Sequence, residues 1–191
     1  MTETITGAEY ISEAHVRHIM RYVQARDWLN DKPYKILDAA CGTGYGSKLL
    51  AKKHLVDGID FNEEAIKEAE KVFIPNCTFK QADLLRSEGN YKCGAIVSIE
   101  TIEHFNRYDG AKLVRNFADW LPKHGVLIIS TPYCSLSGPS PITTQHLWEY
   151  SLTDFEQLIA GNGFQIEILK PERHEGKAGR LGYCMVKAIK R

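Results

Sequence analysis

Short apolar runs alternate with stretches of helical periodicity along most of the chain. Apolar residues recur at helical spacing from about Tyr10 to Leu29, which predicts an amphipathic helix that ends before Pro33. Beyond it, the pattern switches repeatedly between strand and helix. The predicted strands are Tyr34–Ala39, Leu55–Asp60, Thr78–Ala82, Ala95–Ile99 and Val126–Ser130, and the predicted helices are Tyr45–Lys53, Asn62–Val72 and Tyr108–Leu121.

The C-terminal third departs from this alternation. A Pro-, Ser- and Gly-rich segment, Thr131–Tyr150, precedes a predicted helix over Leu152–Ala160 and two late strands, Phe164–Leu169 and Leu181–Ile189. Alternating strands and helices predict an α/β fold with a Rossmann-like, seven-stranded, mostly parallel sheet, helices on both faces and a C-terminal antiparallel hairpin. We expect a single domain over residues 1–191, with an N-terminal helical cap (1–33) and a long loop (131–150).

A glycine-rich turn lies between the first strand and its helix. The strand ends in Asp38, and Gly42, Gly44 and Gly46 follow at alternate positions. Glycines in such a turn let a ligand approach the backbone closely, beside the free N–H groups of the helix start. Dinucleotide folds instead use G-x-G-x-x-G, and a carboxylate here would repel a pyrophosphate but suit a cationic amino group.

This turn resembles motif I of the class I S-adenosylmethionine (SAM) dependent methyltransferases, D/E-x-G-x-G-x-G, with Ala40 in place of the first glycine. The resemblance implies that Asp38 helps to place the methionyl ammonium group of SAM. It also implies that SAM lies against the backbone at Ala40, Gly42 and Gly44. The architecture of that class matches the predicted sheet over nearly the whole chain.

Further acids end the next two strands. Asp60 can accept both hydrogen bonds of a ribose diol, or it can simply partner the helix that follows; Phe61 would cover one face of the adenine. Asp83 and Leu84 resemble the segment of this class that contacts the adenine amine and ring. Because these acids and the motif I acid end consecutive strands, they should meet at the ligand-binding edge of the sheet. Ser98, on the fourth strand, completes the predicted cofactor-binding set.

Ionisable side chains follow the fourth strand directly. Glu100, Glu103 and His104 have i, i+3, i+4 spacing, so we expect them on one helix face beside the SAM methyl group. The run looks like the E-x-x-E-H segment of the ubiquinone-biosynthesis O-methyltransferases, which holds a divalent cation, and so implies Mg²⁺ or a similar ion on these three residues. Alternatively His104 alone is the general base and the glutamates, Glu100 among them, orient it. A third interpretation is structural: the acidic side chains stabilise the positive end of a helix that begins here.

The segment 131–150 is the expected acceptor loop, because long loops beside a rigid sheet often carry specificity. Its aromatic and polar side chains, Tyr133, His146, Trp148, Glu149 and Tyr150, suit a sugar or an aromatic acceptor. His146 is a candidate second base or further metal ligand, or it merely caps the loop. Together with the start Thr6-Gly7-Ala8-Glu9-Tyr10, the motifs are also similar to those of bacterial methyltransferases associated with surface-polysaccharide biosynthesis.

The composition of the chain argues against several classes of partner and location. The chain has 24 Lys and Arg against 24 Asp and Glu, and this formal neutrality argues against a nucleic-acid partner. Five scattered cysteines without a C-x-x-C pair predict reduced thiols in a reducing compartment. No apolar leader or membrane-length run is present, so we expect a cytoplasmic protein without membrane insertion. The sequence is compatible with a homodimer.

These observations predict a SAM-dependent O-methyltransferase acting on a hydroxyl of a small acceptor, such as a sugar or nucleotide sugar. An N-methyltransferase of a small amine is the first alternative. A NAD-dependent oxidoreductase and a non-catalytic SAM-binding protein are the others.

Overall fold

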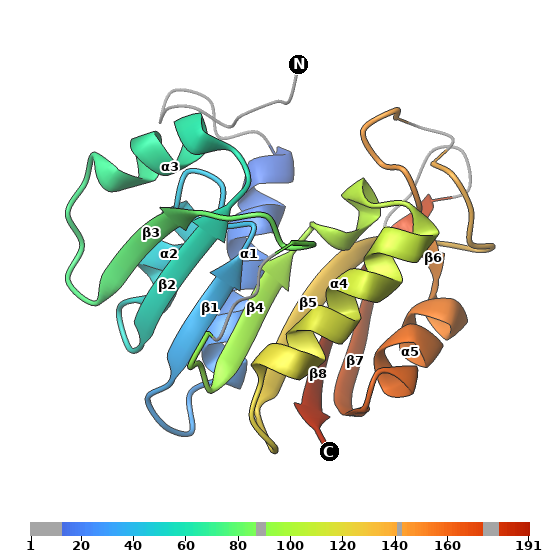
Figure 1. The fold of residues 1–191 in the computed structure, drawn as a ribbon. Coiled ribbons are helices and arrows are strands. Elements are labelled where there is room, and N and C mark those ends of the chain that lie inside the picture. Colours follow the sequence, from blue (N-terminus) through green and yellow to red (C-terminus); the bar gives the residue numbers. More distant parts are fainter. Residues whose placement is uncertain (1–12, 87–90, 141–142, 174–179) are drawn as a thin grey trace.

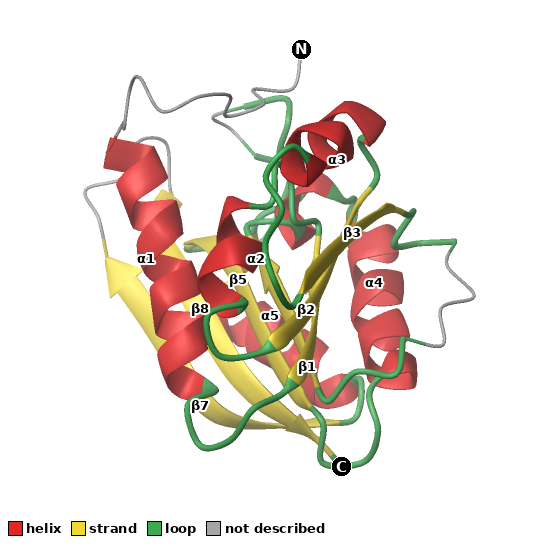
Figure 2. Cartoon of the chain, turned by 90° about the vertical axis from the view of Figure 1, so that its left-hand side faces the viewer, coloured by secondary structure: helices red, strands yellow, loops and turns green. Residues whose placement is uncertain are grey.

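The computed structural model of the chain describes residues 13–86, 91–140, 143–173 and 180–191. A central sheet is covered by helices on both faces (Figures 1 and 2). The helices are α1 (Glu13–Trp28), α2 (Tyr45–Leu50), α3 (Glu63–Glu70), the 3-10 turn η1 (Ile102–His104), α4 (Arg107–Trp120) and α5 (Leu152–Gly161). The strands are β1 (Lys35–Ala39), β2 (Leu55–Asp60), β3 (Cys77–Gln81), β4 (Ala95–Ile99), β5 (Val126–Cys134), β6 (Tyr150–Ser151), β7 (Phe164–Arg173) and β8 (Arg180–Lys190).

The sheet has the order β3-β2-β1-β4-β5-β8-β7, with the short β6 beside the end of β5. Strands β1 to β5 pair in parallel, whereas β8 pairs antiparallel with both β5 and β7. This confirms the predicted α/β fold, its parallel sheet and its closing hairpin. The strand order reverses between β1 and β4, and open α/β sheets bind ligands at the carboxyl end of such a switch point.

Two hydrophobic clusters hold the layers together. One joins α4 and α5 to one face of the sheet through residues such as Phe117 and Phe155. The other joins α1 and α2 to the opposite face through residues such as Ala25 and Leu50, and Figure 2 shows both helices on that face. Strands buried on both faces explain the continuous apolar runs of the sequence. None of the helices in the described part of the chain is both long and apolar enough to cross a membrane.

Local signals predicted the first half of the fold closely. The bounds of β2 and β4 are those predicted, and Asn62 caps α3 by accepting hydrogen bonds from the backbone N–H groups of Glu64 (2.9 Å) and Ala65 (3.3 Å). Helix α2 is shorter than predicted, because a turn begins at Ala51. The first residues of the predicted N-terminal helix lie outside the described part.

The predicted bounds of the loop, 131 and 150, are both wrong. Thr131–Cys134 continues β5, because the antiparallel β8 pairs with it as far as Cys134. Tyr150 belongs to β6, which pairs with Tyr133 and Cys134. Partners from distant parts of the chain therefore override the local turn signal of Pro132. The connection between β5 and β6 runs over residues 135–149, of which 141 and 142 lie outside the described part.

Helix α1 packs directly onto the glycine turn. The side chain of Tyr22 is 2% exposed, and a Cβ atom added to Gly46 would lie 2.2 Å from its Cζ atom. Gly46 is therefore required by the approach of the ring, although it lies inside α2. This contact joins the N-terminal helix to the predicted ligand-binding turn.

Replacing Gly46 by Ala should lower the free energy of unfolding by about 1–3 kcal/mol, because the methyl group would displace the buried ring of Tyr22. Gly161→Ala is the matched control: Gly161 also lies in a helix, but its added Cβ would meet nothing within 4 Å. That variant should be neutral or gain up to about 1 kcal/mol from helix propensity. Urea unfolding measures both, and equal effects would contradict the packing argument.

Candidate functional site

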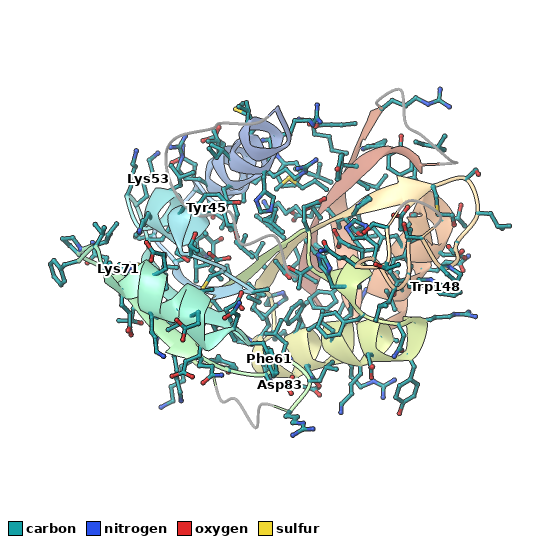
Figure 3. All side chains as sticks on the ribbon, turned by 90° about the horizontal axis from the view of Figure 1, so that it is seen from above. Tyr45, Lys53, Phe61, Lys71, Asp83 and Trp148 are labelled. Atoms are coloured by element: carbon teal, nitrogen blue, oxygen red, sulfur yellow. The ribbon has the colours of Figure 1, made fainter. Side chains whose placement is uncertain are left out.

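A cavity of about 670 Å³ opens at the carboxyl ends of β1, β2 and β4, a size typical of small-molecule sites. Figure 3 looks down on this end of the molecule and shows Phe61 and Asp83 on one side of it. Most of the predicted site residues line the cavity: Ala40, Gly42, Asp60, Phe61, Asp83, Leu84, Glu100 and His104. The others, Asp38, Gly44, Ser98, Glu103 and His146, do not reach its surface.

The glycine turn adopts left-handed backbone conformations at three alternate positions. The φ angles are 66° at Ala40, 54° at Gly42 and 77° at Gly44. A side chain on Gly42 would meet no atom within 4 Å, so this backbone faces open space, whereas one on Gly44 would clash with Phe79 at 2.6 Å. Gly42 thus leaves room for a ligand and Gly44 leaves room for the core. An alanine with positive φ carries about 1–2 kcal/mol of strain, which explains why glycine suits position 40 of this motif.

Asp60 is held rigidly at the rim of the cavity. Its Oδ2 accepts a hydrogen bond from the Gly42 N–H (2.8 Å), and its Oδ1 accepts one from the Asn62 N–H (2.8 Å). Each carboxylate oxygen keeps a second lone pair. A fixed carboxylate with two remaining acceptor positions matches two adjacent hydroxyl groups. The neighbouring Phe61 is 73% exposed and offers a ring face to a ligand.

Asp83 and Leu84 form the wall beyond β3. Oδ1 of Asp83 accepts a hydrogen bond from the N–H of Leu85 (2.8 Å), and its Oδ2 lies 3.4 Å from Nε of Arg86. The carbonyl of the buried Leu84 accepts a hydrogen bond from Asn116 of α4 (2.8 Å). The short turn after β3 is therefore fixed from two sides.

Asp38 lies behind the cavity wall. Its carboxylate is fully buried: Oδ1 accepts a hydrogen bond from the Tyr22 hydroxyl (3.1 Å) and Oδ2 accepts one from Ser47 (2.5 Å). Tyr22 itself lines the cavity. The structure therefore uses Asp38 to join α1, β1 and α2, rather than exposing it to a ligand. Ser98 is likewise buried, and its hydroxyl has no hydrogen-bond partner among the described residues.

Burial raises the pKa of Asp38 to about 7, although the hydrogen bonds from Ser47 and Tyr22 oppose the shift; the charge of Asp60 adds to it. Burial, and then the nearby Asp38 carboxylate, raise the pKa of Tyr22 well above its ordinary value. The Tyr22 hydroxyl is therefore a lasting hydrogen-bond donor to Asp38.

Glu100 does not share a helix face with Glu103 and His104, so that prediction is wrong. The backbone is left-handed at Glu100 (φ 53°), and only the short turn η1 follows. The Glu100 side chain turns towards β5 and α1. Its Oε1 accepts a hydrogen bond from Ser130 (2.7 Å) and lies 3.7 Å from Nε of Arg21. Strained backbone of this kind gathers at functional sites.

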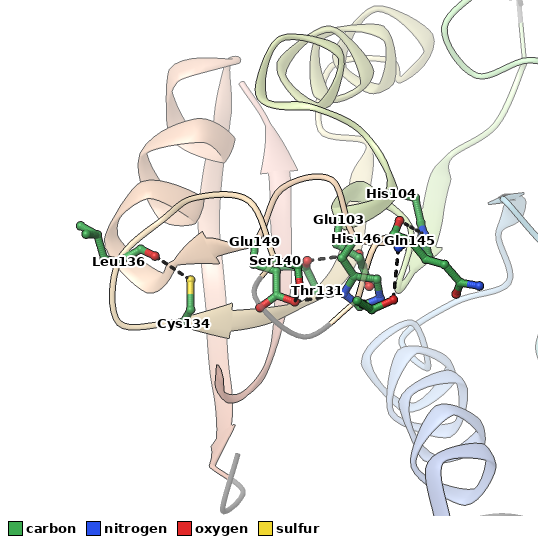
Figure 4. Close-up of polar contacts among 10 residues, drawn as sticks. Glu103, His104, Thr131, Cys134, Leu136, Ser140, Gln145, His146 and Glu149 are labelled. Carbon is green, nitrogen blue, oxygen red and sulfur yellow. Dashed lines mark hydrogen bonds and ion pairs between the residues drawn. The ribbon is translucent and has the colours of Figure 1, made fainter. Parts of the chain in front are cut away.

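The structure places a different trio together. One potential ligand atom each of Glu103, His104 and His146 lies within 4.8 Å of the others, and the two imidazole rings are 5.0 Å apart, edge to face. Glu103 is buried and accepts a hydrogen bond from Thr131 (3.1 Å). Figure 4 shows this arrangement at the joint between η1 and the loop 135–149. Of the residues predicted as metal ligands, Glu103, His104 and His146 lie together, whereas Glu100 is not part of this group.

Both imidazoles are oriented through Nδ1. Nδ1 of His104 lies 3.0 Å from the carbonyl oxygen of Gln145, and Nδ1 of His146 lies 3.1 Å from Oε1 of Glu149. A carbonyl oxygen only accepts hydrogen bonds, so Nδ1 of His104 carries the proton. In the neutral ring, Nε2 of His104 then keeps its lone pair, which suits a base or a metal ligand.

Several lining residues have no motif that reveals them in the sequence. His18 and Tyr22 reach the cavity from α1, Tyr45 from α2 and Gln145 from the loop. The rings of His18, Tyr22 and Tyr45 form a cluster with centroid distances of 5.6–5.8 Å. Their only sequence signal is that His18 and Tyr22 share a helix face. The packing of this face of α1 over the glycine turn is set by tertiary contacts, which the sequence alone does not reveal.

Residues 9–168 match a family model described as a methyltransferase domain. Among curated proteins, a probable S-adenosylmethionine-dependent methyltransferase of Mycobacterium tuberculosis is 30% identical over 134 residues, 68% of this chain and 48% of the relative. Phosphoethanolamine N-methyltransferase 3 of Arabidopsis thaliana is 31% identical over 184 residues, 90% of this chain and 36% of the relative. The chain thus spans about half, or less, of the length of these relatives.

The fold is also similar to that of solved structures. Magnesium protoporphyrin IX methyltransferase from Synechocystis with bound SAH superposes with a TM-score of 0.78 over 97% of this chain and 90% of that one. The sequence identity is 19%, so this likeness concerns the fold.

Asp38→Asn should change how stability depends on pH. Between about pH 4 and pH 7 the folded chain binds a proton at Asp38 more tightly than the unfolded chain does, so this contribution to stability is lost as the pH rises towards 7. Asparagine does not titrate. The free energy of unfolding of the variant, relative to the wild type, should therefore rise over this range in urea unfolding at fixed pH values. A constant difference would contradict the raised pKa.

Proposed function

Starting from the fact that this chain belongs to the methyltransferase-domain family, we propose that it transfers the methyl group of SAM to a hydroxyl of a small acceptor. A sugar or nucleotide sugar is the proposed acceptor class, on the strength of the sequence likeness to polysaccharide-associated methyltransferases. The observation that carries the O-methyl proposal is His104, an imidazole on the cavity with Nδ1 held by a backbone carbonyl and Nε2 left to act as a base.

The cavity supports one orientation of SAM. The two remaining acceptor positions of Asp60 suit the ribose hydroxyls, and Phe61, Asp83 and Leu84 suit the adenine. The methionyl end then runs along the glycine turn, beneath the hydroxyl-bearing rings of Tyr22 and Tyr45. In this orientation the methyl group faces the region of Glu100 and His104.

The transfer is an in-line displacement, for which the protein positions the acceptor and removes its proton. The acceptor oxygen forms a bond to the methyl carbon, the carbon–sulfur bond breaks, and its electron pair stays on sulfur as S-adenosylhomocysteine forms. The acceptor proton passes to Nε2 of His104. Glu100, held by Ser130 and Arg21, offers a fixed oxygen to orient the acceptor beside that base.

N-methylation is the second candidate, and a specific observation favours it. The Arabidopsis relative, aligned over 90% of this chain, is named a phosphoethanolamine N-methyltransferase. A neutral amine attacks the methyl group without prior loss of a proton, so it depends less on a base. An assay that detects the release of S-adenosylhomocysteine, with hexoses, nucleotide sugars and phosphoethanolamine as acceptors, separates the two candidates by showing which acceptor is methylated.

A metal ion on Glu103, His104 and His146 would polarise the acceptor hydroxyl and lower its pKa. Two imidazoles and one carboxylate suit Mn²⁺, Fe²⁺ or Zn²⁺, whereas Mg²⁺ prefers oxygen ligands. The donor set therefore does not fit the Mg²⁺ implied by the sequence resemblance. The proposed transfer needs only the imidazole.

Asp60→Ala should weaken SAM binding about tenfold or more, because it removes both proposed ribose contacts and loosens the turn at Gly42. His104→Ala should keep the SAM affinity within about twofold and lower kcat about 10²- to 10⁴-fold, the usual contribution of a general base. Calorimetry with SAM and turnover of the best acceptor measure the two effects. Asp57→Ala on the same strand and His124→Ala at the amino end of β5 are the controls. Equal loss of SAM affinity in both test variants would contradict this division of roles.

Treatment with EDTA should leave the turnover unchanged, because the proposed base needs no ion. The measurement is the initial rate after chelation and after adding back Mn²⁺, Zn²⁺ or Mg²⁺ to separate samples. If EDTA abolishes the activity and Mn²⁺ or Zn²⁺ restores it, the reaction depends on a metal ion on Glu103, His104 and His146 and not on His104 as a base.

A further inference from the structure

A buried carboxylate lies behind the two imidazoles. Glu149, the last residue of the loop 135–149, is 1% exposed. Its Oε1 accepts a hydrogen bond from the Ser140 hydroxyl (2.7 Å) and lies 3.1 Å from Nδ1 of His146. Its main-chain N–H and C=O pair with Gly138 at 2.8 and 3.0 Å, so the residue is fixed at both main chain and side chain. A buried carboxylate is costly unless it is hydrogen-bonded, and His146 is positioned to compensate its charge.

Glu149, His146 and His104 form a row that leads from the interior to the cavity. His104 lines the cavity, whereas His146 does not and is 16% exposed. The rings of the two histidines are in edge-to-face contact. In Figure 4 Glu149 lies on the far side of His146 from His104. The carboxylate itself does not line the cavity, and His146 lies between it and His104.

The loop that carries this row is anchored to η1. The N–H groups of Leu147 and Trp148 both donate to the carbonyl oxygen of Glu103, at 2.8 and 3.2 Å. Together with the contact between Gln145 and His104, these bonds fix the positions of both imidazoles relative to η1. Glu103 adds a second buried carboxylate beside the rings.

We propose that Glu149 is a positioning residue for methyl transfer, an inference that rests on the proposed role of His104 as base. Glu149 holds His146 with its proton on Nδ1, and the His146 ring, in edge-to-face contact with His104, keeps the His104 imidazole in the orientation that presents Nε2 to the acceptor. The same carboxylate–imidazole arrangement orients the histidine of hydrolytic triads.

Nitrogen-15 NMR of histidine-labelled protein tests the first half of the proposal without any acceptor. In the wild type the His146 signals should show a protonated Nδ1 and an unprotonated Nε2. In Glu149→Gln the amide can donate as well as accept, so this preference should be lost. Ser140→Ala removes the hydrogen bond from the Ser140 hydroxyl to the same oxygen and should keep the wild-type pattern. A proton on Nε2 of His146 in the wild type would overturn the proposal.

Kinetics test the second half. With the best acceptor of the panel, Glu149→Gln should lower kcat at least about tenfold and leave the KM values for SAM and acceptor within about twofold. Ser140→Ala should lose less than about threefold, and both variants should keep the wild-type thermal midpoint within a few degrees. Wild-type kcat in Glu149→Gln would overturn the positioning role, whereas wild-type kcat in His104→Ala would overturn the proposed base itself.

Discussion

The buried carboxylate of Asp38 is the constraint on which the cofactor side of the structure depends. It lies near the carboxyl end of β1 and accepts hydrogen bonds from Tyr22 of α1 and Ser47 of α2, so three elements meet at one group. A carboxylate without exposed surface must be hydrogen-bonded, and these two bonds also fix the turn between the elements. From that turn, Gly42 faces the cavity and donates its N–H to Asp60. The geometry of the proposed ribose site therefore begins with a residue that does not line the cavity.

The sequence predicted what is decided locally. Strand ends, the Asn62 cap and the cavity positions of Gly42, Asp60 and Asp83 follow from hydrophobic period and from turn residues at strand ends. It could not predict that Asp38 is covered, because Tyr22 reaches it from a helix that no motif connects to the turn. The extension of β5 depends on pairing with β8, about fifty residues away in the chain.

The reactive side of the cavity shows the same limit. Helical spacing grouped Glu100 with Glu103 and His104, but one left-handed residue turned Glu100 away and a distant loop supplied His146 instead. Glu149 and Ser140 come with that loop. Rigid backbone contacts to η1, rather than side-chain packing alone, hold these imidazoles in place. The proposed chemistry thus depends on how residues 145–148 contact η1.

The most direct test of this account is a crystal structure of the chain with S-adenosylhomocysteine. We expect ribose hydroxyls hydrogen-bonded to Asp60, adenine beside Asp83 and Leu84, and the sulfur directed towards Glu100 and His104. Asp38 should stay bonded to Tyr22 and Ser47, without contact to the ligand. A ligand bound outside this cavity, or one whose sulfur points away from His104, would contradict both the cofactor site and the proposed base.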